Sequence, residues 1–184
     1  VAALSNADAG TVEKVKADAL VDYARSCLPL ISCICPTFGR PPESQHLIEE
    51  AIQSFLLQDY PNKELILVND CPEQELACDA PGVRVVNVPV RFLSLADKFD
   101  AGVASARGDL IAIWDDHGIS FPWRLSLSWQ MLGHADCINT QCAWLCRDGV
   151  IINDCQSVTP RSDAPLFRRD AIRDIGGYAS LTCG

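Results

Sequence analysis

Residues 110–117 read LIAIWDDH, which places two carboxylates and an imidazole directly after a short apolar run. The apolar run predicts a buried strand whose carboxyl end carries Asp115, Asp116 and His117. Adjacent carboxylates repel each other, so a cationic side chain is expected beside them. Carboxylates and imidazoles bind divalent metals, and ligands of open α/β sheets bind at the carboxyl ends of the strands. The pattern favours a metal that holds an anion such as a diphosphate; the plain alternative is a solvated aspartate pair in a strand-to-helix turn.

Apolar strands and amphipathic helices alternate on the N-terminal side of this stretch. The other predicted strands are 30–35, 64–68 and 83–88. Residues 47–56 and 94–107 repeat apolar side chains at helical spacing, and Gly108 is expected to end the second helix as a C-cap glycine. Such alternation implies parallel strands joined by right-handed crossovers. The predicted fold class is therefore α/β, with a doubly wound, mostly parallel sheet.

Shorter elements are predicted after the aspartate pair. Residues 122–132 indicate a helix whose core-facing side chains are Trp123, Leu127 and Met131. The segment Arg147-Asp148-Gly149 lies between two apolar runs and is typical of a hairpin turn. The remaining predicted elements are a strand at 165–169 and a helix at 170–175.

Length and charge limit the classes of protein to which the chain can belong. Its 184 residues suit one domain, which we expect over 29–184, behind a helical extension at 1–28. The formal net charge of −9 argues against a nucleic-acid partner. No apolar stretch is long enough to span a membrane. Because the chain starts at Val1 without a Met, it is expected to be processed or cut from something longer.

The chain has ten cysteines, but no two of them form a Cys-x-x-Cys pair of the kind that binds zinc. Cys33 and Cys35 alternate within an apolar strand, where a free thiol packs as a small hydrophobic side chain. Mostly reduced thiols favour a cytoplasmic protein. The alternatives are a secreted disulfide framework, which is usually found in shorter chains, and a metal site or one disulfide between Cys137 and Cys155.

Four blocks of sequence, taken together, resemble the inverting family-2 glycosyltransferases of the GT-A fold. The blocks are 31–40 (ISCICPTFGR), 51–70 (with QDYPNKELI at 58–66), 101–110 (AGVASARGDL) and 167–178 (with FRR and IGGY). They are similar, in order and spacing, to that family's opening strand, its QxYP turn, the segment before its metal-binding strand and its late GGF segment. The likeness covers about residues 30–184 and implies a GT-A sheet that is incomplete at its C-terminal end.

The resemblance implies a nucleotide site at the ends of the strands. The residues that would bind the nucleotide are Pro36, Thr37, Phe38, Arg40, Asp70, Lys98, Asp115 and Asp116. Thr37 would lie near the base or ribose, Asp70 would hydrogen-bond the base, and Lys98 would face the diphosphate. Without the resemblance, these three residues read as a strand-ending turn, a turn aspartate and a solvated lysine.

The resemblance also implies a divalent metal, Mn²⁺ or Mg²⁺. Asp116 and His117 fall on the family's Asp-x-Asp region and would hold this ion, with Asp116 in contact with the metal or the ribose. His117 stands where the family usually has the metal-binding Asp. A neutral imidazole can bind Mn²⁺ but does not neutralise its charge as a carboxylate does.

The activity that the resemblance implies is transfer of a sugar from a nucleotide-diphosphate donor to a hydroxyl of a sugar or glycan acceptor, with inversion. The family's catalytic base is an Asp just after the GGF segment, so here it is expected just beyond Gly184. The alternative is a non-catalytic nucleotide-sugar-binding module that lacks the base. A nucleotidyltransferase is disfavoured, because Gly39-Arg40-Pro41-Pro42 is too short and proline-bound to cradle a triphosphate.

Overall fold

The computed structural model describes residues 13–16, 19–20, 23, 26–139, 144–147, 150–153 and 164–178. Its strands are β1 (Ile31–Thr37), β2 (Lys63–Asn69), β3 (Val83–Asn87), β4 (Leu110–Ile113), β5 (Cys137–Ile138), β6 (Trp144–Arg147), β7 (Val150–Asn153) and β8 (Leu166–Arg168). Its helical segments include α2 (His46–Leu56), α3 (Leu95–Ser105), α4 (Arg124–Leu132), α5 (Arg169–Asp174) and the short 3-10 helix η2 (Pro42–Ser44).

The main sheet has six strands in the order β3-β2-β1-β4-β8-β5. Strands β1 to β4 pair in parallel, and β8 runs antiparallel to both of its neighbours. The predicted mostly parallel sheet is therefore confirmed. The predicted hairpin is also present, because β6 and β7 pair with each other as a separate antiparallel sheet.

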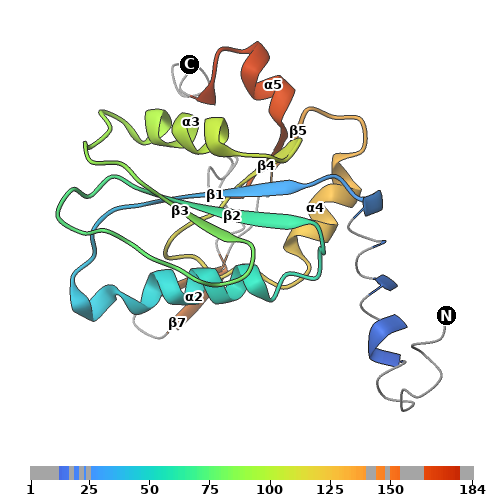
Figure 1. The fold of residues 1–184 in the computed structure, drawn as a ribbon, viewed down its shortest axis with the longest axis horizontal. Coiled ribbons are helices and arrows are strands. Elements are labelled where there is room, and N and C mark those ends of the chain that lie inside the picture. Colours follow the sequence, from blue (N-terminus) through green and yellow to red (C-terminus); the bar gives the residue numbers. More distant parts are fainter. Residues whose placement is uncertain are drawn as a thin grey trace, which may run out of the picture.

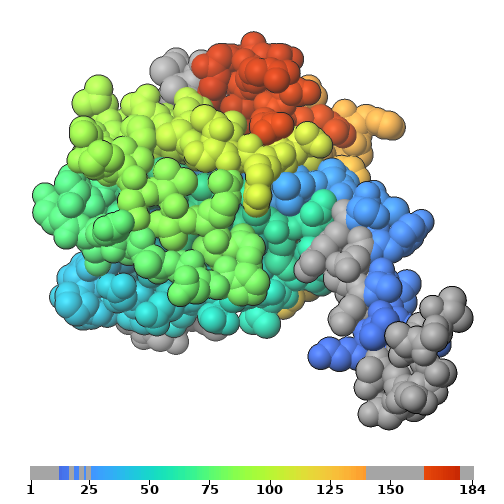
Figure 2. Space-filling model, in the orientation of Figure 1, coloured from blue at the N-terminus to red at the C-terminus, as the bar shows by residue number. Residues whose placement is uncertain are grey.

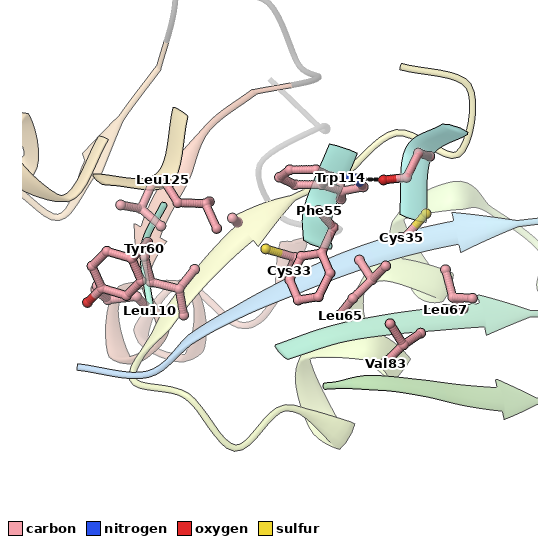
Figure 3. Packing of buried hydrophobic residues seen from close by; sticks show 14 of the residues in the cluster. Cys33, Cys35, Phe55, Tyr60, Leu65, Leu67, Val83, Leu110, Trp114 and Leu125 are labelled. Atoms are coloured by element: carbon pink, nitrogen blue, oxygen red, sulfur yellow. Dashed lines mark hydrogen bonds between the residues drawn. The ribbon is translucent and has the colours of Figure 1, made fainter. Parts of the chain in front are cut away.

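Helices cover both faces of the main sheet, with α2 and α3 on opposite sides (Figure 1). One apolar cluster joins the α2 and α4 side chains to one face of the strands, including Cys33 and Cys35 (Figure 3). The other cluster joins Ile34 of the same strand to Phe99 of α3 and Ile172 of α5. Because side chains alternate along a strand, β1 contributes to both cores, and the sheet is doubly wound as predicted.

The described residues before Leu28 lie to one side of the domain, away from helices α2 and α3 (Figures 1 and 2). Residues 13–16, 19–20, 23 and 26–27 of this segment are helical. The division of the chain at residue 28 stays a prediction.

Gly108 does not cap helix α3, contrary to the sequence prediction. The helix ends at Ser105, and its capping residue Ala106 already has extended backbone angles, φ −71° and ψ 145°. A Cβ atom at Gly108 would lie 2.4 Å from the carbonyl oxygen of Leu30. Glycine is therefore needed at this position because the chain passes close to the backbone before β1, and not because a helix ends there.

The predicted core face of helix α4 is also wrong. Trp123, Leu127 and Met131 are 51%, 45% and 65% exposed, whereas Leu125 and Leu132 are buried. The side chain of Gln58 fixes this orientation, because its Oε1 accepts a hydrogen bond from the Leu125 N–H and its Nε2 donates to the Phe121 carbonyl. A helical period alone leaves open which face is turned inward, and a contact from a distant segment decides it here.

A buried carboxylate holds the start of strand β4, which carries the aspartate pair. Glu64 accepts hydrogen bonds from the Ser32 hydroxyl and from both the backbone and the guanidinium of Arg107, and it lies 3.3 Å from Arg84 Nε. Burial raises the pKa of Glu64, but these hydrogen bonds and charges outweigh burial and lower the pKa below its ordinary value. The turn between α3 and β4 is thus tied to β1 and β2.

Candidate functional site

The carboxyl ends of β1, β2 and β4 meet at one edge of the sheet. β1 pairs in parallel with β2 on one side and with β4 on the other. The three strands end at Thr37, Asn69 and Ile113, and the predicted site residues Asp70 and Asp116 follow directly or within three residues. The topology therefore brings together residues that are far apart in the sequence, at the edge where ligands of open α/β sheets bind.

Trp114 anchors the segment that carries the aspartate pair. Its indole is buried, lies edge-on to the Phe55 ring at 6.0 Å between centroids, and donates from Nε1 to the Ala51 carbonyl (Figure 3). The Arg124 guanidinium lies 4.6 Å from the centroid of the Trp114 ring, on which it makes a cation–π contact. The two aspartates thus follow a side chain that is fixed against helix α2.

Asp70 and Lys98 form a buried ion pair at this edge. The Lys98 ammonium, on helix α3, donates to Asp70 Oδ1 and to the Thr37 carbonyl oxygen. The other oxygen, Asp70 Oδ2, accepts a hydrogen bond from the Phe92 N–H at 3.0 Å. Burial raises the pKa of Asp70, but the hydrogen bonds from Lys98 and Phe92 outweigh it and hold the pKa below its ordinary value. Lys98 is only 6% exposed, so it is not a solvated helix lysine.

Asp116 is held by a bidentate contact with Arg40. Arg40 Nη2 lies 2.5 Å from Asp116 Oδ1, and Arg40 Nε donates to Oδ2 at 3.2 Å. Burial raises the pKa of Asp116, but hydrogen bonds from Arg40, His117 and Thr37 outweigh it and lower the pKa. Arg40 is therefore the cation that the adjacent carboxylates led us to expect. Asp115 is half-buried beside this pair.

Asp116 and His117 offer ligand atoms for a divalent metal. His117 Nδ1 lies 2.9 Å from Asp116 Oδ1. Neighbouring ligand atoms around an octahedral ion with bonds of about 2.0–2.1 Å are roughly 3 Å apart, so the spacing of these two atoms fits one ion. Among the described residues, no group of three or more His, Cys, Asp or Glu is placed to hold a metal. An ion bound here would take its further ligands from water or from a phosphate group.

Phe38 forms the wall of a small pocket beside Arg40. Its ring is 37% exposed, and the Arg91 guanidinium lies 3.9 Å from the ring centroid. The pocket is lined by Thr37, Phe38, Arg40, Gln45, Ile48, Gln74 and Leu76. Pro36, by contrast, lies within strand β1, paired with Val68, because the strand continues to Thr37 and does not end before the proline as predicted.

Sequence reasoning missed the polar residues that fix the loop around Arg40. Asn69 donates from Nδ2 to the Gln74 carbonyl and to Asn87 Oδ1, at 2.6 and 2.9 Å. Gln74 in turn accepts the Arg40 backbone N–H on its Oε1 at 3.0 Å. These side chains come from a loop and from strand ends, where no hydrophobic period exists to indicate them. Asn69 therefore fixes Gln74 and, through Gln74, the backbone at Arg40.

Two sequence predictions concern residues outside the described part of the chain. These are the catalytic base expected just beyond Gly184 and the disulfide or metal site between Cys137 and Cys155, because Cys142 and Cys155 are not described. Six cysteines that the structure does describe are free thiols: Cys27, Cys33, Cys35, Cys71, Cys78 and Cys137. Of the described helices, none is long and apolar enough to cross a membrane.

The geometry defines a class of α/β domain, in which a doubly wound sheet carries acidic side chains at the carboxyl ends of its strands. Residues 32–173 match the family model described as Glycosyl transferase family 2. This match covers most of the chain, so the chain belongs to that family.

One curated relative is the Escherichia coli (strain K12) protein named "Putative colanic acid biosynthesis glycosyl transferase WcaA". It is 33% identical to this chain over 106 residues, which are 54% of the chain and 36% of the relative. The chain therefore spans about a third of the length of this relative.

Solved structures with a similar fold include two proteins in complex with nucleotide sugars. Staphylococcus aureus TarS 1–349 in complex with UDP-GlcNAc superposes with a TM-score of 0.59 at 17% identity, over 79% of this chain and 47% of that one. The mannosyltransferase PcManGT from Pyrobaculum calidifontis, in complex with GDP-Man and Mn²⁺, has a TM-score of 0.59 at 17% identity, over 89% and 57%. These similarities confirm the predicted GT-A fold.

Proposed function

We propose that the chain is the donor-binding domain of a glycosyltransferase. It would transfer a sugar from a nucleotide-diphosphate donor to a hydroxyl of a sugar or glycan acceptor, with inversion and with assistance from a metal. The observation that carries the proposal is that two ion pairs, Lys98–Asp70 and Arg40–Asp116, lie at the carboxyl edge of the sheet, where Lys98 also donates to the Thr37 carbonyl. Family membership and the nucleotide sugars bound by the structural neighbours support it.

In this proposal, one group of site residues would face the base and ribose of the donor, and another would face its diphosphate. Phe38, with an exposed ring, and Thr37 would line the base and ribose, and Asp70 would accept a hydrogen bond from the base through a lone pair that Lys98 and Phe92 leave unused. Arg40 would bind the diphosphate, because a guanidinium fork matches two phosphate oxygens. Asp115 would add a polar contact on the ribose side.

Asp116 and His117 would hold a Mn²⁺ or Mg²⁺ ion. The support for this assignment is the 2.9 Å spacing of their ligand atoms and the Mn²⁺ in the complex of PcManGT. When bound, such an ion supplies Lewis-acid stabilisation of the charge that develops on the leaving diphosphate. The protein's own contribution is to orient the donor on fixed strand ends, so that little reorganisation is needed during the reaction.

A thermal-shift panel tests donor binding. UDP-, GDP- and dTDP-sugars are added with and without Mn²⁺, and one of them is expected to raise the melting temperature only when Mn²⁺ is present. A ligand at 100 times its Kd stabilises the folded state by about 2.7 kcal/mol, which is roughly 5–10 °C for a domain of this size. The corresponding nucleosides, which lack the diphosphate, serve as the control. No shift with any of the donors would contradict the proposal.

Product analysis tests the reaction itself. The donor that stabilises the domain is incubated with a panel of sugar acceptors, and the anomeric configuration of new product is read by NMR. Inversion predicts the configuration opposite to that of the donor. Retention of configuration would contradict the mechanism, and donor binding without either transfer or hydrolysis would favour the alternative of a non-catalytic binding module.

We also infer a reducing, cytoplasmic setting for this reaction. Six of the described cysteines are free thiols, and two of these, Cys33 and Cys35, are buried in the core. Free thiols are typical of the cytosol.

A further inference from the structure

We propose that Arg40 and the divalent metal compete for Asp116: Arg40 is the counter-ion of this carboxylate until a metal binds, and its guanidinium then turns to the diphosphate. This inference rests on the proposed function, because it needs a metal and a phosphate ligand at the same edge. It goes beyond that function by making the two ligands cooperative through one arginine side chain.

The first support is that Arg40 uses both oxygens of Asp116. One nitrogen lies 2.5 Å from Oδ1 and another 3.2 Å from Oδ2, and the two side chains are only 22% and 12% exposed. A bidentate guanidinium–carboxylate contact of this kind is among the strongest pairs that side chains form. Oδ1 also contacts His117 Nδ1, the second atom that a metal would need. The two atoms that would bind a metal, Asp116 Oδ1 and His117 Nδ1, therefore already contact each other, and Oδ1 also contacts Arg40.

The second support is electrostatic. A divalent ion on Asp116 Oδ1 would lie close to the guanidinium that contacts the same carboxylate. Like charges at such a distance disfavour each other, and a half-buried site screens them less than bulk water does. Simultaneous contact of Arg40 and the metal with Asp116 is therefore unfavourable, and binding of the metal requires the guanidinium to move away.

The third support is that the backbone at Arg40 is held in place, so that any movement of this residue is confined to its side chain. Its backbone N–H donates to Gln74 Oε1 at 3.0 Å. The preceding Gly39 packs so closely on Cys71 that a Cβ atom there would lie 2.5 Å from Cys71 Sγ. The guanidinium can thus turn from Asp116 to a diphosphate held beside it, while the loop stays in place. The diphosphate supplies the negative charge that replaces Asp116 as the partner of Arg40.

Mn²⁺ binding in the absence of nucleotide tests this competition. Binding is measured by electron paramagnetic resonance and calorimetry for the wild type and for Arg40→Gln, which keeps a polar side chain but removes the charge. The variant is expected to bind Mn²⁺ roughly 5- to 100-fold more tightly than the wild type, because Asp116 is no longer occupied. The matched control is Arg173→Gln, which removes an arginine that pairs with Asp170 at an exposed position of α5.

A conservative variant shows whether a change in metal affinity comes from the lost contact and not from a loss of folding in Arg40→Gln. Arg40→Lys retains the charge but not the two-pronged contact, so its affinity for Mn²⁺ is expected between those of the wild type and Arg40→Gln. Nucleoside diphosphate is also expected to raise the affinity for Mn²⁺ by a smaller factor in Arg40→Gln than in the wild type, since coupling between two ligands is reciprocal.

Two results would overturn the competition: equal Mn²⁺ affinity in the wild type and Arg40→Gln, or no Mn²⁺ binding by either. Failure of the proposed function has a different signature, in which no nucleoside diphosphate binds with or without metal. Tighter Mn²⁺ binding by Arg40→Gln would support the competition even then.

Discussion

Asp116→Asn is expected to abolish the dependence of nucleoside diphosphate binding on Mn²⁺. In the wild type, the ion should raise the affinity for the diphosphate by roughly 100-fold or more, since even groups that only support a metal ligand affect affinity by 10- to 100-fold. Without the carboxylate, the ratio of affinities with and without Mn²⁺ should fall to about 1. Calorimetric titrations with and without the ion measure this ratio directly.

The ratio is the informative quantity because Asp116→Asn also frees Arg40. A guanidinium without its carboxylate partner can bind the diphosphate in the absence of metal, so the affinity without Mn²⁺ should stay the same or increase. A simple loss of the nucleotide pocket would instead weaken both affinities together. The two affinities therefore separate a missing metal ligand from a damaged pocket.

The fold should survive this substitution. Asp116 lies after the end of β4, outside the strands that form the core of the sheet. The matched control is Asp109→Asn, at a side chain that is 84% exposed and 3.8 Å from Arg169. Both variants are expected to unfold in urea near the wild-type midpoint. An unchanged affinity ratio in folded Asp116→Asn would remove Asp116 from the metal site.

The sequence alone predicts the sheet, because hydrophobic period and element order carry that information. Strands β1, β2 and β4 are short apolar runs, and helix α2 shows its period clearly, so the parallel order and the edge that holds the site follow. The aspartate pair also predicts a cation beside it from charge repulsion alone. What the pattern cannot say is that the cation is Arg40, which lies 76 positions away in sequence.

The errors in the sequence reading share one physical cause. The backbone of Leu30 requires a glycine at position 108, and the side chain of Gln58 determines which face of α4 is exposed. Only the tertiary structure brings these groups close. The burial of Lys98 has the same kind of cause. A lysine in an amphipathic helix is expected in solvent. Its burial depends on Asp70, which arrives from the end of another strand. Local sequence patterns predict helices and strands, whereas contacts between these elements decide which side chains are buried.

Lys98→Met is expected to lower the free energy of unfolding by about 3–5 kcal/mol at pH 7. The substitution keeps most of the side-chain volume but removes the charge that compensates Asp70 at a buried position. It also takes a donor from the Thr37 carbonyl, so the ends of β1 and β2 lose their common contact with α3. An uncompensated buried carboxylate is costly, whereas two matched neutral groups are not.

The pH dependence identifies the cause. In the wild type, the pKa of Asp70 is below its ordinary value, so the pair contributes stability above the pKa of an unfolded aspartate, and this contribution is lost as pH falls through the folded pKa. In Lys98→Met, the carboxylate can become neutral by binding a proton, which removes the penalty. The difference between variant and wild type should therefore be largest near neutral pH and shrink below about pH 4.

A double variant and a control complete the measurement. Lys98→Met combined with Asp70→Asn should recover a large part of the lost stability, because the amide oxygen can still accept the Phe92 N–H while no buried charge remains. Lys14→Met, at an exposed helical position, should change the free energy of unfolding by less than about 0.5 kcal/mol. Urea unfolding across pH measures all four proteins. If Lys98→Met were as stable as the wild type at neutral pH, or if its deficit did not depend on pH, the ion pair would not be what holds the two strand ends to α3.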